Sequence, residues 1–550
     1  MIRTTRRPLA ALLAAAVVVA AAFVATGSAS PSDPANLANV ATANTKTPGV
    51  SSPNVLAAGL AETPVAQGSN RLENGTPQVP FYGYDGNGSL LPVYPSWTEA
   101  TKTEPDKNTY LAINGLKGAD PSYYYGSHFL FQGHEGGTPG YLTRINLDAD
   151  GAHRVTLLAT QDSSGADLPD IDGSTWDPWA RHLLFTAEGS KGGGVWQATL
   201  DVPAKVDSLT GIIGQGGYEG IQNDSDGNLW IVEDSGGPAG TANPHAKQPN
   251  SFLFRFKPYD RADLTKGGKL QALQVTSLRS GQPIAFHSGQ ADADIKSADT
   301  KDLHTYGHAF ATRWVTVHDT ATDGTAPFSG NAAAKAQQAT PFKRPENGQF
   351  QPGTGFRSFF FDEIGDTDNR TEAGGDYGGF GAVQILSQHS PSADRGTLRL
   401  FYQGDQNHGS LDNVTFIARD KVAFVEDAGD TLHSQRNALD SGFVFDTDTD
   451  YSAGAQPVRF LAEGRDASAT IDSALSGSPG FQNEGDNEIT GIHASDGDPS
   501  PRGLLGAKVP RLFSFSDDRS AQRWRLFYTA QHGDNVTWEV LPARAGHGGY

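Results

Sequence analysis

The sequence repeats one pattern: a short apolar strand, a polar turn rich in glycine, and a second short strand. The copies lie at 128–147, 183–200, 229–256, 422–445 and 525–540. The first copies follow one another at roughly 45–55 residues, which is the spacing of propeller blades. Patterns for long helices are nearly absent, and the best short one, 331–338, lies in an insertion. The repeat predicts an all-β fold, a β-propeller with loop insertions and few short helices.

A stack of β-sandwich domains would also produce many short strands. No change in composition marks a linker in the middle of the chain, which favours a single domain. Residues 31–70 are rich in Ala, Thr, Asn, Pro and Ser and show no apolar period. We therefore expect 31–70 to be a flexible linker and 71–550 to be one propeller domain.

One copy of the pattern, 219–234, is predicted to be a β-hairpin with its turn at Asp226-Gly227. In that register Glu219 lies opposite Asp234. Directly opposed carboxylates repel, so the pair requires a cation or a shared proton. Two solvated acids at a fraying hairpin end are the alternative, since charged residues are mostly exposed.

A second hairpin, 412–427, aligns with the first without a gap, and both end in Val-Glu-Asp. Its expected turn at Arg419-Asp420 places Asp412 opposite Asp427. Two acidic hairpins in one register are harder to explain as fraying ends. In a propeller, strand ends of different blades converge on one central channel. The two pairs therefore predict one multi-metal pocket.

Carboxylate ligands favour hard cations such as calcium, magnesium, manganese or ferric iron. The chain has no cysteine, and no histidine pair has helical metal-ligand spacing, so a zincin or thiolate site is not expected. Residues 486–493 resemble another inner strand, which adds Glu488 to the candidates. The candidate acids are Glu188, Glu219, Glu233, Asp234, Asp412, Glu426, Asp427 and Glu488.

The tripeptide Arg344-Pro345-Glu346 offers a guanidinium beside a carboxylate. Proline is expected to hold Arg344 in an extended conformation, in which residues i and i+2 point the same way. If Glu346 holds a metal, Arg344 can bind an anion on that metal. A local surface ion pair is the alternative.

The N-terminus is predicted to be an export signal over 1–30, with charged Arg3, Arg6 and Arg7, an apolar run and small residues before the cleavage site. The pair Arg6-Arg7 also fits a twin-arginine signal. We therefore expect a secreted protein, and a monomer. The net charge of −20 makes nucleic acid and anionic membrane poor partners, and it suits calcium in an extracellular setting.

Short motifs in a fixed order make the chain resemble the PhoX-type alkaline phosphatases and their secreted relatives. They run from about residue 111 to 538. The motifs are Ser174-Thr175-Trp176, Thr186-Ala187-Glu188, Tyr218-Glu219-Gly220, Glu233-Asp234, Phe252 to Pro258 with Asp263-Leu264, Arg344-Pro345-Glu346 and Leu411-Asp412-Asn413.

This resemblance implies a six-bladed propeller in which ferric iron and calcium hydrolyse small phosphate esters. It implies that Arg344 contacts phosphate. The implied metal ligands are Glu188, Glu219, Asp234, Glu346 and Asp412. The family has a cysteine ligand for iron where this chain has Ala187, and an acid where it has Gly189. A calcium-only site is therefore an alternative to an iron site.

Two other functions remain open from the sequence. A calcium propeller acting on lactones or phosphotriesters would use few acids and one central calcium. A non-catalytic secreted propeller would use calcium for stability and bind a glycan or a protein on one face.

Overall fold

The computed structural model describes residues 37–46, 53–84, 103–137, 139–189, 192–372, 375–464, 488–513, 523–531 and 535–543. The predicted signal peptide, 1–30, lies outside the described residues. Within those ranges, no helix has the length and apolar character needed to cross a membrane.

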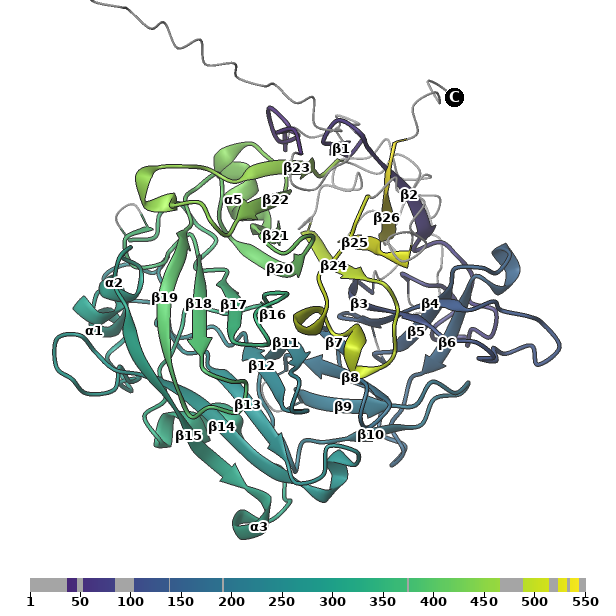
Figure 1. Ribbon diagram of the computed structural model, residues 1–550, viewed down its shortest axis with the longest axis horizontal. Coiled ribbons are helices and arrows are strands. Elements are labelled where there is room, and N and C mark those ends of the chain that lie inside the picture. Colours follow the sequence, from purple (N-terminus) through teal and green to yellow (C-terminus); the bar gives the residue numbers. More distant parts are fainter. Residues whose placement is uncertain are drawn as a thin grey trace, which may run out of the picture.

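The described strands fall into five sheets, arranged radially around an axis (Figure 1). One sheet contains β3 (Pro105–Ala112), β4 (His128–His134), β5 (Leu142–Asn146) and β6 (Val155–Ala159). A second contains β7 (Ser174–Asp177), β8 (His182–Ala187), β9 (Gly194–Ala198) and β10 (Val206–Ser208). A third contains β20 (Leu411–Phe416), β21 (Lys421–Glu426), β22 (Ser441–Asp446), β23 (Val458–Ala462) and β1 (Val55–Leu56). A fourth sheet contains β24 (Glu488–Ser495), β25 (Arg525–Gln531), β26 (Val536–Pro542) and β2 (Leu60–Ala66).

The fifth sheet has nine strands, and β15 (Phe310–Asp319) joins its two halves. One half is β11 (Tyr218–Asn223), β12 (Leu229–Glu233), β13 (Leu253–Pro258) and β14 (Gly268–Val275); the other is β16 (Gly348–Phe350), β17 (Ser358–Glu363), β18 (Ala382–Gln388) and β19 (Arg395–Gln403). If β15 is taken as the joint, each half is a four-stranded blade.

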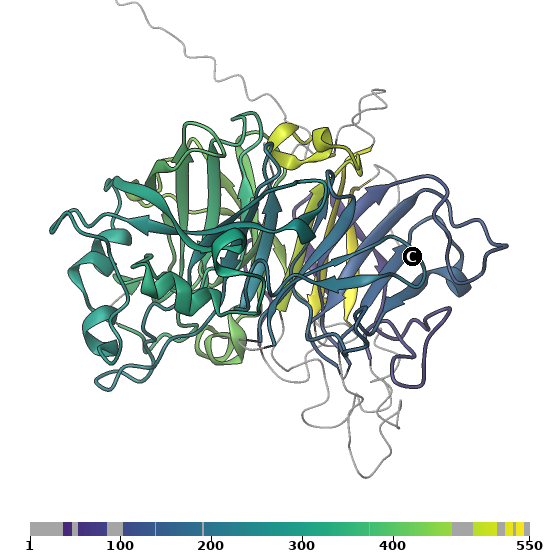
Figure 2. The ribbon, with the colours of Figure 1, turned by 90° about the horizontal axis from the view of Figure 1, so that it is seen from below.

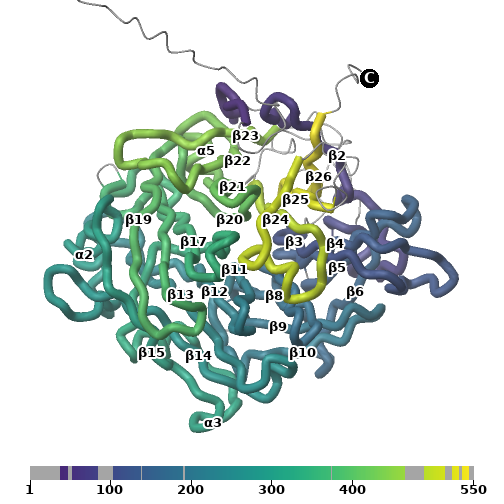
Figure 3. Tube along the Cα trace, viewed as in Figure 1, coloured from purple at the N-terminus to yellow at the C-terminus, as the bar shows by residue number. Residues whose placement is uncertain are grey.

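Six inner strands form a closed ring around the axis. β3 contacts β7, β7 contacts β11, β11 contacts β16, β16 contacts β20, β20 contacts β24, and β24 contacts β3 again. The tube in Figure 3 follows the chain around this ring from purple to yellow. The predicted all-β propeller is confirmed.

Helices are few and short, as predicted. They are α1 (Ala291–Ile295), α2 (Ala298–Leu303), α3 (Thr320–Asp323), α4 (Gly330–Ala336) and α5 (Gly429–Arg436), with 3-10 turns at η2 (Gly151–His153), η3 (Leu264–Lys266), η5 (Tyr451–Ala453), η7 (Pro501–Gly503) and η8 (Leu505–Ala507). Figure 2 shows the yellow segment with η7 and η8 lying at one face of the ring. This segment follows the C-terminal end of β24.

Part of the segment predicted as a linker is built into the propeller. β2 pairs with β26 from Leu60↔Pro542 to Ala66↔Thr537, so an N-terminal strand completes the sheet that holds the C-terminal strands. β1 pairs with β23 in the neighbouring sheet. Leu60, Val65 and Ala66 are buried. The low hydrophobicity of 31–70 as a whole hid two outer strands, which need few apolar residues.

The register predicted for the two acidic hairpins is wrong by one residue. Asn223 pairs with Leu229 rather than with Trp230. The connection is a five-residue loop, 224–228, in which the Asp224 carboxylate accepts hydrogen bonds from the backbone of Asp226 and Asn228. An aspartate that binds backbone amides two and four residues on stabilises a longer turn than Asp-Gly alone.

The equivalence of the two hairpins, in contrast, is retained. Each has a bulge at the same place, between Tyr218 and Ile221 in β11 and between Leu411 and Val414 in β20. Two residues of the inner strand there oppose one residue of its partner, which is the definition of a classic bulge. Glu219 and Asp412 each occupy the first bulge position, which releases them from cross-strand pairing.

Removal of β1 and β2 tests this ring closure. A chain beginning at residue 68 leaves the outer edge of β26 unpaired and no longer buries Leu60 and Val65, a loss of about 3–6 kcal/mol. We expect a lower melting temperature by circular dichroism and self-association in size-exclusion chromatography. A chain beginning at residue 37 is the control. Equal melting temperatures for the two chains would contradict this role of β2.

Candidate functional site

Each inner strand of the ring has an acid within two residues of its first residue. The bulges in β3, β11 and β20 free their acids from pairing, as described for Glu219. Asp172 and Glu346 lie in the turns that enter β7 and β16. The acids are Asp106, Asp172, Glu219, Glu346, Asp412 and Glu488.

A second set of acids follows the last residue of the second strand in several sheets. Residues alternate in direction along a strand, so when the last strand residue points outward the next one points to the channel. Glu135 follows β4, Glu188 follows β8, Asp234 follows β12 and Asp427 follows β21. The two sets meet at the same end of the channel.

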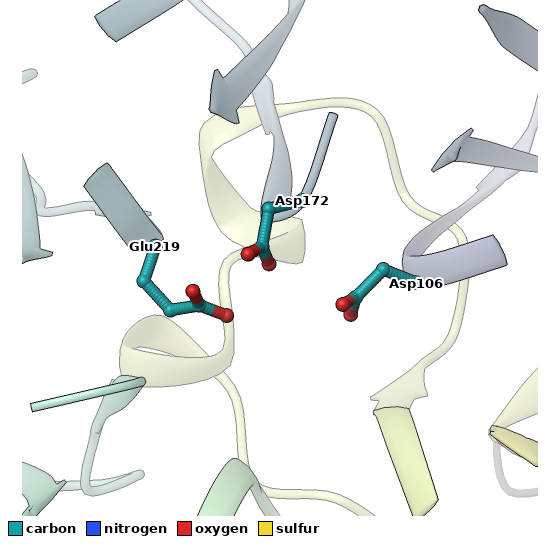
Figure 4. Close-up of side chains that lie close together, drawn as sticks. All are labelled: Asp106, Asp172 and Glu219. Atoms are coloured by element: carbon teal, nitrogen blue, oxygen red, sulfur yellow. The ribbon is translucent and has the colours of Figure 1, made fainter. Parts of the chain in front are cut away.

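Eight of these carboxylates form four overlapping groups whose oxygens lie within 4.8 Å of one another. Figure 4 shows three of them, from three different inner strands, pointing toward one another. The groups are Asp106 with Asp172 and Glu219; Glu135 with Asp172 and Glu188; Glu188 with Asp234 and Glu346; and Glu219 with Glu346 and Asp412. We call these eight residues the acid ring. All five acids that the resemblance implies as ligands belong to it.

Burial and mutual repulsion act on the whole ring. Burial, and then the neighbouring Asp172 and Glu188, raise the pKa of Glu219 well above its usual value. Burial and the Asp234 charge do the same for Glu346. Such groups require protons or cations between them, because bare carboxylates at this spacing cannot all ionise.

The donors of the ring fit a hard metal ion. Asp172 Oδ1 and Glu346 Oε1 are buried and have no hydrogen-bond partner among the described residues. All donors are carboxylate oxygens, the ligands that calcium prefers and that ferric iron accepts. Glu346 belongs to two of the groups, so one residue serves two adjacent positions.

Arg344 lies at the edge of the ring, but its backbone differs from the prediction. Its φ is +56° rather than extended. Its Nε lies 3.0 and 2.9 Å from the Asp234 oxygens, and Nη2 lies 3.6 Å from Glu346 Oε1. The guanidinium is thus beside Glu346 as expected, while two carboxylates hold it and offset the cost of the left-handed conformation. The alternative, an ion pair at the surface, does not hold: the two charges are close, but Glu346 is buried.

A second cation, Lys247, lies close to Arg344 on the loop between β12 and β13. Burial, and then the Arg344 charge, lower the pKa of Lys247, whereas the charges of Asp234, Asp366 and Glu346 raise it. Its ammonium makes no hydrogen bond or ion pair with any residue in the described ranges. A half-buried, unpaired ammonium near a guanidinium favours an anion between or beside them.

Two of the additional candidate acids, Glu233 and Glu426, point away from the ring. Glu233 accepts hydrogen bonds from the backbone of Phe252 and from Asn331, near the start of α4. Glu426 pairs with Arg436 at 3.0 Å and accepts from the backbone of Ser441. They end β12 and β21, and strand alternation explains why their successors, Asp234 and Asp427, face the channel instead.

Asp427 and Glu488, the other two additional candidates, lie beside the ring. Burial, and then Asp427 and Asp412, raise the pKa of Glu488 well above its usual value. Neither belongs to a group of three oxygens within 4.8 Å. Ala187 is fully buried among apolar residues that include Ile171 and Phe185, so no donor atom stands there.

Sequence reasoning missed three members of the ring: Asp106, Glu135 and Asp172. Asp106 and Glu135 occupy the same places around the β3 bulge that Glu219 and Asp234 occupy around the β11 bulge. An alignment of every strand pair, and not of the two most similar hairpins alone, would have placed Glu135 after β4 as Asp234 is placed after β12.

Comparison with known proteins identifies the fold. No family model matches the sequence, and no curated protein matches it. The structure is similar to that of Pseudomonas fluorescens PhoX in complex with vanadate, a transition state analogue, with a TM-score of 0.52 and 12% identity over 92% of this chain and 97% of that chain. Chaetomium thermophilum Sqt1 matches with a TM-score of 0.32 and 11% identity over 76% and 80% of the chains. At these identities the likeness to PhoX shows a shared fold.

Glu188 makes the stability of the metal-free chain depend on pH. Burial and the Asp234 charge raise its pKa from 4.5 to about 8. A raised carboxyl pKa contributes stability that is present below the unfolded value and is lost as pH rises through the folded one. In chelator, we expect the melting temperature to fall between about pH 5 and about pH 8.

In Glu188→Gln this fall should be smaller, because the amide does not titrate. Asp226→Asn, in the exposed turn of the β11–β12 hairpin, is the control and should keep the wild-type slope. A metal-free wild-type chain that becomes more stable over this pH range would show that the ring is not protonated as described.

Proposed function

We propose that this chain is a secreted, metal-dependent phosphatase that hydrolyses small phosphate esters at the acid ring. One observation supports this most: carboxylates at the starts of five inner strands gather beside Arg344, in a fold similar to that of a PhoX bound to vanadate. Vanadate, an anion, is described in that structure as a transition-state analogue. A buried ring of carboxylates would repel an anion, so Arg344 or bound cations are needed for anion binding.

In this proposal, Glu219, Glu346 and Asp412 hold one cation, and Glu188 and Asp234 with Glu346 hold a second. Bound cations would supply the positive charge that attracts and polarises a phosphate group. Calcium is the ion that the all-oxygen donor set favours. Iron is the less favoured ion, since Ala187 provides no ligand.

A phosphate ester is negatively charged, so its repulsion by a chain of net charge −20 is the main difficulty for this function. Arg344 would address it by forking onto phosphate oxygens, as guanidinium does. Its fixed position between Asp234 and Glu346 pre-orients it, so little reorganisation is needed as charge spreads over the phosphoryl oxygens. Lys247, with its unpaired ammonium, would bind the same substrate from the loop above.

The number of acids disfavours a lactonase-like site with a single calcium. A non-catalytic calcium propeller is the second candidate, because Arg344 is already paired with Asp234. We propose a monomer and no nucleic-acid partner, in keeping with the acidic surface charge.

Removal of a ring carboxylate should abolish activity. With calcium supplied, Glu219→Gln should lower kcat/KM for a phosphate monoester by at least about 10³-fold, because the variant loses a ligand charge from two groups of the ring. Asp226→Asn, at the other end of the same hairpin, should retain activity. If wild-type protein loaded with calcium or with iron has no activity that Glu219→Gln abolishes, the phosphatase proposal is wrong.

Substitutions of Arg344 and of Lys247 should change different kinetic constants. Arg344→Ala should lower kcat about 10²–10³-fold, as expected for a group that binds developing charge. Lys247→Ala should raise KM several-fold with a smaller effect on kcat, because it contacts bound and reacting phosphate alike.

Arg357→Ala, an exposed arginine outside the channel, is the matched control. In a non-catalytic propeller, none of these substitutions would alter turnover, and calcium removal would lower only the melting temperature.

A further inference from the structure

A lysine side chain reaches from one inner strand of the ring to the segment that enters the opposite one. Lys107 belongs to β3, and its Nζ lies 2.5 Å from Oδ1 of Asn347, just before β16. Around the ring, β7 and β11 separate these strands on one side, and β20 and β24 separate them on the other. The two strands are therefore opposite one another, and the ammonium lies near the axis.

Lys107 is almost completely buried, with 2% of its surface exposed. The only hydrogen bond of its ammonium within the described ranges is the one to neutral Asn347, and no described carboxylate oxygen lies within 4.0 Å of Nζ. Burial lowers the pKa of Lys107, and the charges of four carboxylates act in the opposite direction: Asp412, Asp362, Asp106 and Glu219. Three of these four belong to the acid ring.

The backbone of Asn347, the residue that binds the ammonium, is held by Asp362. Its backbone N–H donates to Asp362 Oδ1 at 2.7 Å, and its carbonyl accepts from Asp362 N at 3.1 Å. A Cβ at Gly220 would lie 2.6 Å from Asn347 Oδ1, so glycine at the second bulge position of β11 leaves the space that this side chain occupies.

We propose that Lys107 is a resident counter-charge on the propeller axis, which holds the acid ring together without metal and weakens its binding of divalent cations. The inference rests on the metal binding proposed above, not on phosphate hydrolysis. An ammonium fixed among carboxylates offsets part of their mutual repulsion, and it repels any cation bound to the same carboxylates.

Lys107→Met removes the charge and keeps most of the apolar stem. Without metal, this variant should melt at a lower temperature than wild type, because the ring loses its counter-charge. Calcium affinity, measured by titration calorimetry on metal-free protein, should rise by on the order of tenfold or more, since one repulsive charge a few ångströms away is lost. Lys107→Arg keeps the charge and should match wild type more closely in both measurements.

Lys257→Met, on β13 and outside the channel, is the control for loss of a lysine. Lys107→Gln, which is neutral but retains a hydrogen-bond donor for Asn347, separates loss of charge from loss of the hydrogen bond. If both neutral variants fold only when calcium is present while Lys107→Arg folds without it, the counter-charge role is supported.

Two results would overturn the inference, and they are distinguishable. If wild type binds calcium and Lys107→Met binds it with the same affinity, the counter-charge role fails and the metal site stands. If wild type binds neither calcium nor another divalent cation, the proposed metal site fails and this inference fails with it.

Discussion

The interaction on which this structure depends is the repulsion among carboxylates gathered at the channel. Eight of them, contributed by five inner strands and by residues that follow three second strands, have oxygens within 4.8 Å of their group neighbours. In water such charges would separate, but the closed ring of inner strands does not permit it. The carboxylates therefore create a strong negative potential, which protons, Lys107, Arg344 or added cations offset. Such a site lowers the stability of the folded chain. A cation that binds the folded chain and not the unfolded chain would therefore stabilise the fold.

Two backbone features create that potential. Strand bulges at Asp106, Glu219 and Asp412 take one residue out of pairing in each of three inner strands, β3, β11 and β20, and aim it at the axis. Contact of β24 with β3 then closes the ring of inner strands, and the pairing of β2 with β26 completes the sheet that holds β24. A bulge alone would leave an acid at a sheet edge, and closure alone would give an apolar channel.

The sequence predicts the architecture because the spacing of the repeats and the alternation of strands and turns remain recognisable when strand boundaries are misplaced by a residue or two. It predicts the register of strand pairing poorly. The gapless alignment of 219–234 with 412–427 is correct, since equivalent strand pairs keep equivalent bulges. The register is wrong because it was derived from Asp226-Gly227, while Asp224 organises a longer loop. Arg344 lies where its neighbours suggest, but its φ of +56° depends on Asp234, which is 110 residues away and cannot be inferred from local preferences.

Beside the ring, three buried glutamates show how the propeller keeps it rigid. Glu233, Glu363 and Glu426 each end the second strand of a blade, directly before a residue at the channel end. Each accepts a hydrogen bond from a backbone amide: those of Phe252, Lys343 and Ser441.

Each of these glutamates also contacts a side chain of a peripheral insertion: Asn331 near α4, His304 after α2, and Arg436 of α5. The outward residue of each strand end is thus fastened to an insertion. In two of the blades the next residue, Asp234 or Asp427, points toward the acid ring. We infer that the insertions serve the site by immobilising these strand ends, because a ring of mutually repelling acids requires a rigid support to keep its geometry.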